Sequence, residues 1–203
     1  MTAQLIGLVI LSYFLGSIPV GVFAARLVGG TDPRWAGSRN IGFTNVLRVA
    51  GKTAGALTLL GDIGKGALAV IIARLMVGSG GSEWILVAAG AVILGHVFSV
   101  FLGFHGGKGV ATALGTWLAI DPIVGAILIC IWLTSLTLWR RSSLAAIMAF
   151  GSLPVLVWIR HPKAAMVLFA VGVTVVILYR HADNIRRLRA GTEPKLGVRE
   201  NPG

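Results

Sequence analysis

Three polar segments of this chain combine glycine with hydroxyl, amide and cationic side chains. They are GSRNIGFTNVLRVAGK (Gly37 to Lys52), GFHGGKGVAT (Gly103 to Thr112) and YRHADNIRRLR (Tyr179 to Arg189). Glycine lets a backbone approach a ligand closely, arginine offers a planar fork of donors, and lysine offers a point charge. This mixture predicts a site for phosphate-bearing ligands.

The first segment offers neutral donors around one cation. Its hydroxyl and amide side chains are Ser38, Asn40, Thr44 and Asn45. If a helix begins at Thr44, Arg48 lies on the same face one turn later, and the first-turn amides favour an anion. The alternative is a solvated connecting loop with an ordinary helix cap.

The second segment surrounds a lysine with glycine. Gly106, Gly107 and Gly109 flank Lys108, so backbone amides can converge on an anion beside the ammonium group. It is not a Walker A loop, because Leu102 stands where glycine is required. A flexible turn with one lysine that sets membrane topology is an equal alternative.

The third segment ends the last apolar span. His181 and Asn184 are three residues apart, so on a continuing helix both side chains can reach one ligand. The surrounding basic residues are interpreted as anchors at an anionic membrane surface: Arg180, Arg186, Arg187 and Arg189.

Three ionisable residues lie inside apolar segments. Asp62 and Lys65 have the spacing of an ion pair on one helix, and His96 lies in the next span. Charges within a bilayer are costly and often mark function. We interpret all three as structural or supporting residues, with a direct role in the site left open.

Composition decides what must position these groups. The 203 residues are 56% hydrophobic and 12% charged, with a mean hydropathy of +0.86, which is typical of an all-α polytopic membrane protein. We expect one domain (1–203), a mobile cytoplasmic tail at 190–203 without a role, and no cleavable signal peptide.

Seven transmembrane helices are predicted from apolar length and helix breakers. They are Gln4 to Val28, Thr53 to Val77, Glu83 to Phe104, Val110 to Ile120, Pro122 to Trp139, Ser143 to Ile159 and Ala164 to Tyr179. The short fourth span is separated from the fifth by Asp121 and Pro122, which read as an N-cap and first-turn pair.

The basic residues orient these spans, because loops rich in Lys and Arg stay in the cytoplasm. One side receives Arg26, Arg34, Arg39, Arg48, Lys52, Lys108, Arg140, Arg141, Arg180, Arg186, Arg187, Arg189, Lys195 and Arg199; the other receives Arg74, Arg160 and Lys163. The N-terminus is therefore expected outside, and the C-terminus and all three polar segments on the cytoplasmic side.

Several kinds of chemistry are disfavoured. The net charge is +11, and the basic residues that produce it flank apolar segments. This arrangement argues for membrane topology over nucleic-acid binding. Cys130 is the single cysteine, and neither a metal-ligand cluster nor a GxSxG elbow occurs. A site of cations and neutral donors suits anion binding and stabilisation of developing negative charge.

Together the segments resemble the bacterial membrane-integral glycerol-3-phosphate acyltransferases that use acyl phosphate, the PlsY type. The similarity extends from GSIPVGVFAARL (Gly16 to Leu27) through DIGKG (Asp62 to Gly66) and GHVFSVFLGFHGGKGVATALG (Gly95 to Gly115) to RHADNIRRL (Arg180 to Leu188). Three positions depart from the family pattern: Arg39 for glycine, Phe43 for alanine and Ser99 for proline.

The resemblance implies a seven-helix bundle whose active site faces the cytoplasm. It implies acyl transfer from acyl phosphate to glycerol 3-phosphate, giving 1-acylglycerol 3-phosphate and phosphate without acyl-CoA, metal or other cofactor. Expected partners are these substrates, membrane lipid and a soluble enzyme that supplies acyl phosphate; a monomer is expected.

The resemblance also assigns roles. Its principal site positions are Ser38, Arg48, Lys108, His181 and Asn184, with Asn40, Thr44, Asn45, Gly106, Gly107 and Gly109 shaping the pockets. The base is either His181 or, as favoured here, a substrate phosphate. A transporter of a small phosphate ester is the rival interpretation, and a scaffold for anionic lipids is a third.

Overall fold

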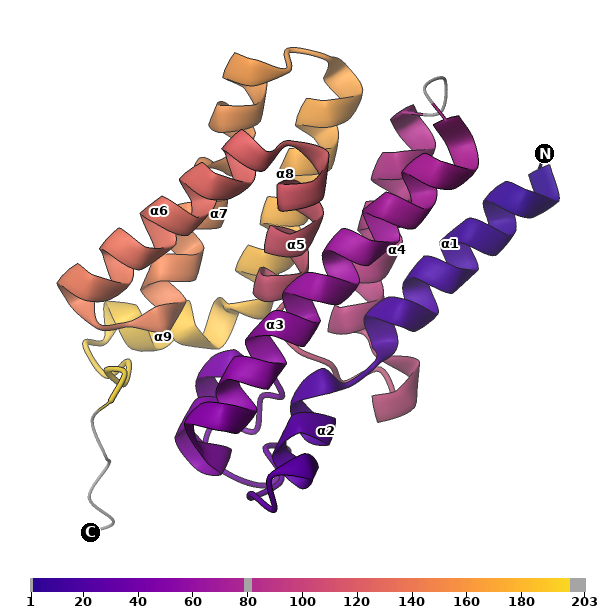
Figure 1. The fold of residues 1–203 in the computed structure, drawn as a ribbon. Coiled ribbons are helices and arrows are strands. Elements are labelled where there is room, and N and C mark those ends of the chain that lie inside the picture. The colour runs from indigo at the N-terminus through magenta and orange to yellow at the C-terminus, as the bar shows by residue number, and fades with distance from the viewer. Residues whose placement is uncertain (1, 79–81, 198–203) are drawn as a thin grey trace, which may run out of the picture.

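The computed structural model describes residues 2–78 and 82–197, and within them the chain is helical with connecting loops. The elements are α1 (Thr2–Ser17), α2 (Val20–Leu27), α3 (Phe43–Val77), α4 (Ser82–Val97), the 3-10 helix η2 (Val100–Leu102), α5 (Val110–Ile120), α6 (Pro122–Trp139), α7 (Ser142–Arg160), α8 (Ala164–Arg180) and α9 (Ala182–Arg189). The long helices form one bundle, with α2, α9 and the start of α3 at the same end (Figure 1).

Five helical stretches in the described residues are long and apolar enough to cross a membrane, and the first of them, Ala3–Leu27, contains α1 and α2. The bent pair α8 and α9 makes a sixth candidate if it counts as one span, and α5 is apolar but has only 11 residues. The chain is therefore an all-helical polytopic membrane bundle.

Several helix boundaries differ from the predicted ones. The first span breaks before Pro19, which lacks a backbone N–H, and resumes as α2. The second begins at Phe43, ten residues early, and bends at Gly51, where φ is +88°. The spacing of Gly51 and Gly55 is typical of a helix-packing contact, but the backbone conformation of Gly51 shows that it forms the kink.

Glycines bring α3 and α5 into close contact. A Cβ on Gly66 would lie 2.1 Å from the carbonyl oxygen of Thr112, and one on Gly115 would lie 2.0 Å from that of Ile63. Helices in lipid gain little by burying apolar surface against one another, so close backbone packing is what holds them. This crossing fixes the N-terminus of α5 beside α3.

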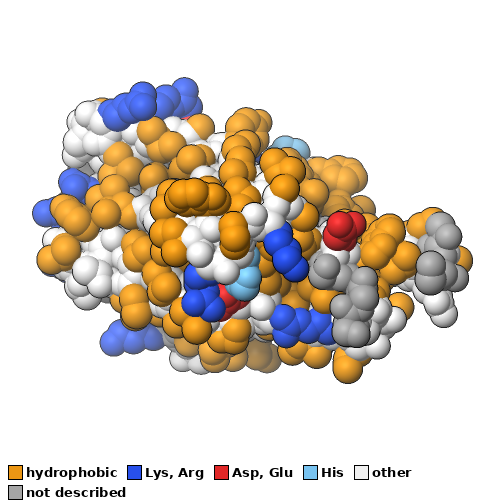
Figure 2. Space-filling model, turned by 90° about the horizontal axis from the view of Figure 1, so that it is seen from above, with side chains coloured by type: hydrophobic (Ala, Val, Ile, Leu, Met, Phe, Trp, Pro, Cys, Tyr) orange, Lys and Arg blue, Asp and Glu red, His pale blue; other side chains and the backbone are white. Residues whose placement is uncertain are grey.

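The main core lies between α5, α6, α7 and α8. Its two largest fully buried side chains are Trp117 and Phe150. Large hydrophobic side chains are also exposed along the helices, among them Leu75, Leu168 and Val175. Figure 2, which views the end with the α5–α6 and α7–α8 turns, shows hydrophobic side chains around charged ones near the middle. Such a surface suits contact with lipid.

Asp121 organises that end. Its side chain caps α6 by accepting from the backbone N–H groups of Ile123 and Val124, at 2.8 and 3.3 Å, which confirms the predicted cap. It also accepts from Arg160 Nε at 2.8 Å and lies 2.6 Å from His161 Nε2. One carboxylate thereby joins the two turns.

Candidate active site

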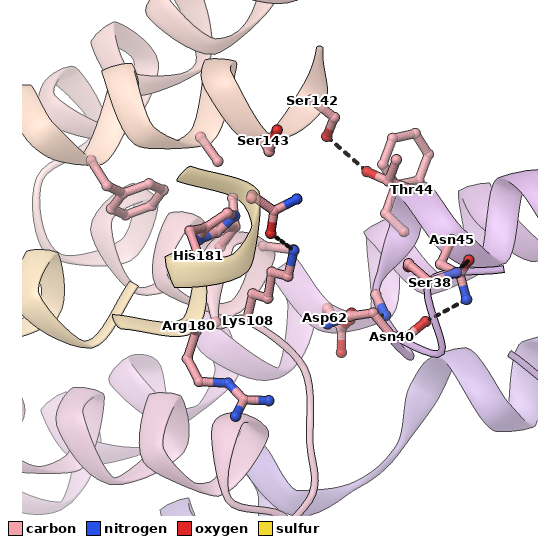
Figure 3. A pocket seen from close by; sticks show the side chains of 18 of the residues that line it. Ser38, Asn40, Thr44, Asn45, Asp62, Lys108, Ser142, Ser143, Arg180 and His181 are labelled. Carbon is pink, nitrogen blue, oxygen red and sulfur yellow. Dashed lines mark hydrogen bonds between the residues drawn. The ribbon is translucent and has the colours of Figure 1, made fainter. Parts of the chain in front are cut away.

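A cavity of about 1010 Å³ lies at the end of the bundle opposite Asp121. All three polar segments line it. In Figure 3, Lys108, Arg180 and His181 lie on one side, Ser38, Asn40 and Thr44 on the other, and Ser142 and Ser143 along a third. Residues that are distant in sequence therefore converge on one pocket.

Asn45 holds the first segment in shape. Its Nδ2 lies 3.1, 3.1 and 2.9 Å from the carbonyl oxygens of Pro33, Ala36 and Asn40, and its Oδ1 accepts from the backbone N–H of Ser38 at 2.9 Å. The side chain is 3% exposed. Its amide is thus committed to the loop, which makes it a positioning group and places Ser38 at the cavity.

Thr44 and Arg48 both face the cavity from the first turns of α3, on the shared face that their spacing predicts. The hydroxyl of Thr44 lies 2.7 Å from that of Ser142 on α7. Asn40 Oδ1 accepts from the N–H of Gly42 at 2.8 Å, just before the helix. Arg39 also lines the cavity, with φ at +56°, a conformation that favours glycine.

The glycine loop uses its amides differently from the prediction. The N–H groups of Gly106 and Gly107 donate to the carbonyl oxygens of Val97 and His96 at the end of α4, at 3.1 and 3.0 Å. They are not free to bind an anion. A Cβ on Gly107 would lie 2.1 Å from His96 Nε2, so glycine is required here for close approach.

The start of α5 supplies the amides that the loop does not. Gly109 is the N-cap residue, with φ at +85°, and no side chain caps the helix. Gly109, Val110 and Ala111 line the cavity. The unpaired first-turn N–H groups and the helix dipole both favour an anion at this position.

Lys108 and Asn184 are joined at the centre of the site. Lys108 Nζ donates to Asn184 Oδ1, and Asn184 Nδ2 donates to Glu193 Oε1 at 2.7 Å. Glu193 Oε1 also accepts from Ser143 Oγ at 2.5 Å, and its Oε2 accepts from Arg187 Nε at 2.8 Å. Glu193 therefore fixes the asparagine that orients the lysine.

Glu193 lies within the tail for which the sequence predicts mobility and no role. Its side chain is buried, its backbone carbonyl accepts from Arg141 Nε at 3.2 Å, and the N–H of Leu196 donates to the carbonyl of Arg140 at 2.6 Å. The described part of the tail, 190–197, is thus packed against the α6–α7 turn, which corrects that prediction; 198–203 lie outside the described residues.

Burial makes the Lys108 ammonium less stable than in water. The pKa of Lys108 falls to about 8, chiefly because of this desolvation; Glu193 raises it, and the charges of Arg187 and Arg180 lower it. An incoming phosphate would restore the compensation that burial removes. The lysine is thus placed to gain from binding an anion.

His181 lies at a bend rather than on a continuing helix, contrary to the prediction. It ends α8, and α9 starts after it at 63° to α8. Its Nδ1 lies 2.8 Å from the carbonyl oxygen of Ile177, so Nδ1 carries the hydrogen and Nε2 is left as an acceptor. Burial and the charge of Lys108 lower the pKa of His181 to about 4, so the ring is neutral at pH 7.

Two arginines interpreted as membrane anchors belong to the site instead. Arg180 donates from Nε to the carbonyl of Gly107 at 3.2 Å and from Nη2 to that of Gly106 at 3.0 Å, while Arg187 holds Glu193. Both line the cavity. The remaining pair, Arg186 and Arg189, does not.

The buried ionisable residues form a network beneath the loop. Lys65 Nζ lies 2.8 Å from Asp62 Oδ1 and donates to the carbonyl of Ile18, at the α1–α2 break, at 2.9 Å. His96 Nδ1 lies 3.4 Å from the same Asp62 oxygen. Asp62 and His96 reach the cavity wall and Lys65 does not, an arrangement that fits the expected supporting role.

The cavity continues into an apolar half between the helices. Its walls there come from α3, α5, α6 and α7: Leu59, Leu114, Ile129, Trp132, Ala146 and Phe150. Within residues 2–78 and 82–197 no group of three or more His, Cys, Asp or Glu is placed to hold a metal ion. A polar anion site that opens into an apolar cavity suits a ligand with a charged head and a hydrocarbon tail.

Sequence reasoning missed five groups at the site: Ser142, Ser143, Glu193, and Arg180 and Arg187 as contacts of the cavity. The two serines carried no signal beyond their place at the start of a helix. A signal for Glu193 did exist, because it is an isolated acid in a strongly basic region that follows the third segment.

Comparisons with known proteins agree with this geometry. The family model described as glycerol-3-phosphate acyltransferase matches residues 6–191. The chain is 46% identical over 197 residues to a glycerol-3-phosphate acyltransferase of Jannaschia sp. (strain CCS1), covering 97% of this chain and 95% of that protein. For the enzyme of that name from Carboxydothermus hydrogenoformans the identity is 42% over 192 residues, covering 95% and 96%.

Solved structures give the same answer. The crystal structure of PlsY (YgiH), an integral membrane glycerol 3-phosphate acyltransferase, matches in its glycerol 3-phosphate form with a TM-score of 0.89 and 39% identity, covering 96% of each chain. Its lysophosphatidic acid form matches with a TM-score of 0.88. The chain is therefore a multi-pass integral membrane protein that belongs to the PlsY-type glycerol-3-phosphate acyltransferase family.

Proposed function

We propose that this enzyme transfers a fatty acyl group from acyl phosphate to glycerol 3-phosphate, releasing 1-acylglycerol 3-phosphate (lysophosphatidate) and inorganic phosphate. One observation carries the proposal: Lys108, Arg48 and the N-terminus of α5 line the same cavity as the apolar walls of α3, α5 and α6. The polar half suits two phosphate groups, and the apolar half suits an acyl chain.

The reaction needs alignment and charge stabilisation more than a strong nucleophile. The sn-1 hydroxyl oxygen attacks the acyl carbon, the bond from that carbon to the phosphate oxygen breaks, and the hydroxyl proton leaves on a phosphate oxygen. We assign Arg48 and Lys108 to the phosphates and the developing oxyanion, and Ser38, His181 and Asn184 to positioning of the substrates.

A substrate phosphate is the preferred base. A histidine with a pKa near 4 is a weak base, and its Nδ1 is already committed to the carbonyl of Ile177. In this scheme His181 Nε2 accepts a hydrogen bond from the glycerol hydroxyl and orients it. Asn40, Thr44 and Gly109 shape the pocket, while Asn45, Gly106 and Gly107 hold its loops.

The proposed topology has seven crossings, with the N-terminus outside and the active site cytoplasmic. It counts α5 and α8 as spans besides the five longer stretches, and it rests on the excess of Lys and Arg in the loops at the cavity end. We further propose a single-domain monomer without a cofactor, which receives acyl phosphate from a soluble enzyme.

The test is a direct assay. Purified protein in lipid vesicles is incubated with acyl phosphate and labelled glycerol 3-phosphate, with acyl-CoA as the alternative donor. Labelled lysophosphatidate and an equal amount of phosphate are expected from acyl phosphate alone. Turnover with acyl-CoA at the same rate would contradict the donor assignment, and a trapped acyl-serine at Ser38 would contradict direct transfer.

A further inference from the structure

The apolar half of the cavity lies where two helices fail to pack. α3 packs on α1, α2, α4 and α5, and α6 packs on α5 and α7, whereas α3 and α6 make few contacts. Both nevertheless line the cavity, through Leu59 of α3 and Ile129 of α6. Side chains rather than helix packing therefore close this side of the site.

Two adjacent contacts bridge the gap near the polar half. The rings of Phe43 on α3 and Trp132 on α6 lie 6.5 Å apart between centroids, at an interplanar angle of 63°. Next to them the hydroxyl of Thr44 meets that of Ser142, at the start of α7. Phe43 and Trp132 both line the cavity, so their edge-to-face pair forms part of its wall.

The two rings differ in how firmly their surroundings pack against them. Trp132 also packs against the main core, and Phe43 belongs to none of the buried hydrophobic clusters of the described residues. Phe43 is also the first residue of α3, directly after the N-cap Gly42. It can change rotamer without disturbing a helix interior, which makes it the movable member.

A donor that arrives from the bilayer creates a particular requirement. Its tail leaves one hydrocarbon environment for another, so transfer out of water contributes little to the choice between tails. Selection must then come from steric fit in the wall of the cavity. Side chains that bridge α3 and α6 beside the polar groups are where that fit is decided.

We propose that Phe43 and Trp132 form a gate between α3 and α6 that determines which acyl chains the active site accepts. The gate opens by movement of Phe43, admits the tail of the donor and closes on its first carbons. Straight chains pass, whereas chains with a methyl branch near the carboxyl carbon meet the rings. The inference rests on the proposed acyl transfer.

The experiment compares donors within each variant. Wild type, Phe43→Ala and Trp132→Leu in lipid vesicles are assayed with straight-chain palmitoyl phosphate and with its 2-methyl and 3-methyl analogues. Phe43→Ala is expected to raise kcat/KM for the branched donors relative to the straight one by about tenfold, with an unchanged KM for glycerol 3-phosphate. Phe101→Ala, an exposed aromatic residue outside this cavity, should keep the wild-type ratio.

The ratio of donors separates a gate from a merely structural contact. A structural contact would lower activity for all donors alike, and such a uniform loss, or an unchanged ratio in both Phe43→Ala and Trp132→Leu, overturns the gate. Wild-type activity with palmitoyl phosphate keeps failure of the gate distinct from failure of the proposed function. If wild type acylates glycerol 3-phosphate with none of the donors, both proposals fall.

Discussion

The two ends of the bundle treat charge in opposite ways. At one end Asp121 caps a helix and lies against Arg160 and His161, so its charge is compensated within the protein. At the other end Lys108 and Arg48 face a cavity, and a buried carboxylate that lines it, Glu193, is shared among several donors. Compensated charge fixes a fold, whereas an excess of cations around a cavity leaves attraction for an anionic ligand.

The largest expected effect comes from removing the excess cations. Lys108→Ala or Arg48→Ala should lower kcat/KM for acyl transfer by about a thousandfold, since the proposed mechanism assigns each charge to a phosphate or to the developing oxyanion. The measurement is labelled lysophosphatidate formation by protein in lipid vesicles. Lys52→Ala removes an exposed cation that does not line the cavity, and this variant should retain activity. Equal losses of activity in all three variants would mean that net charge matters and the position of the cations at the cavity does not.

Part of the cationic end was predictable from sequence, because some of its residues stand in short recognisable patterns. The glycines around Lys108 indicate an anion site, and so does Thr44 one turn before Arg48. Each of these patterns lies within a few residues of sequence. The use of the Gly106 and Gly107 amides was not predictable, since their acceptors belong to the end of α4 and depend on how the loop folds back. A local pattern indicates which groups are present, and tertiary packing decides which of them remain free.

A variant of Glu193 tests whether the cationic end needs this shared carboxylate. Glu193→Ala leaves Asn184, Ser143 and Arg187 without their acceptor, so we expect a loss of about 2–3 kcal/mol in stability and about a thirtyfold loss in kcat/KM. Thermal unfolding in detergent and the acyl-transfer assay measure the two losses. Thr192→Ala, one residue earlier on the exposed surface, is the matched control, and wild-type stability and activity in Glu193→Ala would show that the carboxylate does not organise the site.

The protonation of Lys108 should make activity and stability depend on pH in opposite directions. With a pKa near 8, Lys108 loses its proton above that pH, and kcat/KM should fall about tenfold per pH unit. Stability should not fall with it: the unfolded state keeps that proton up to its ordinary pKa of 10.5, so this group favours folding increasingly from pH 8 to 10.5. In Lys108→Arg the residual activity should lack this alkaline fall, and a fall that persists there must belong to another group.

The packing of the tail shows a second limit of sequence reasoning. Residues with proline, glycine and mixed charge are typical of mobile ends, and here such a segment brings Glu193 into contact with α7 and α9. The bend at His181 was hidden for a similar reason, because a helical pattern runs through it. Asp121, by contrast, was predicted correctly, since an N-cap is defined by its immediate neighbours.

Asp121 should show the smallest effect on catalysis and so provides the strictest test of the comparison. Asp121→Ala removes the cap of α6 and the link to Arg160, with an expected loss of about 1–2 kcal/mol in stability and no more than a twofold change in kcat/KM. Asp121→Asn keeps a capping oxygen and loses the charge, so it should recover most of the stability. Its pKa near 2 lies below the ordinary 3.8, so the contribution of the charge is present above pH 4 and is lost as the pH falls towards 2. The two ends are joined by whole helices. A large loss of acyl transfer in Asp121→Asn at full stability would therefore mean that charge at one end controls activity at the other. The distinction between charges that stabilise the fold and charges that bind the ligand would then be wrong.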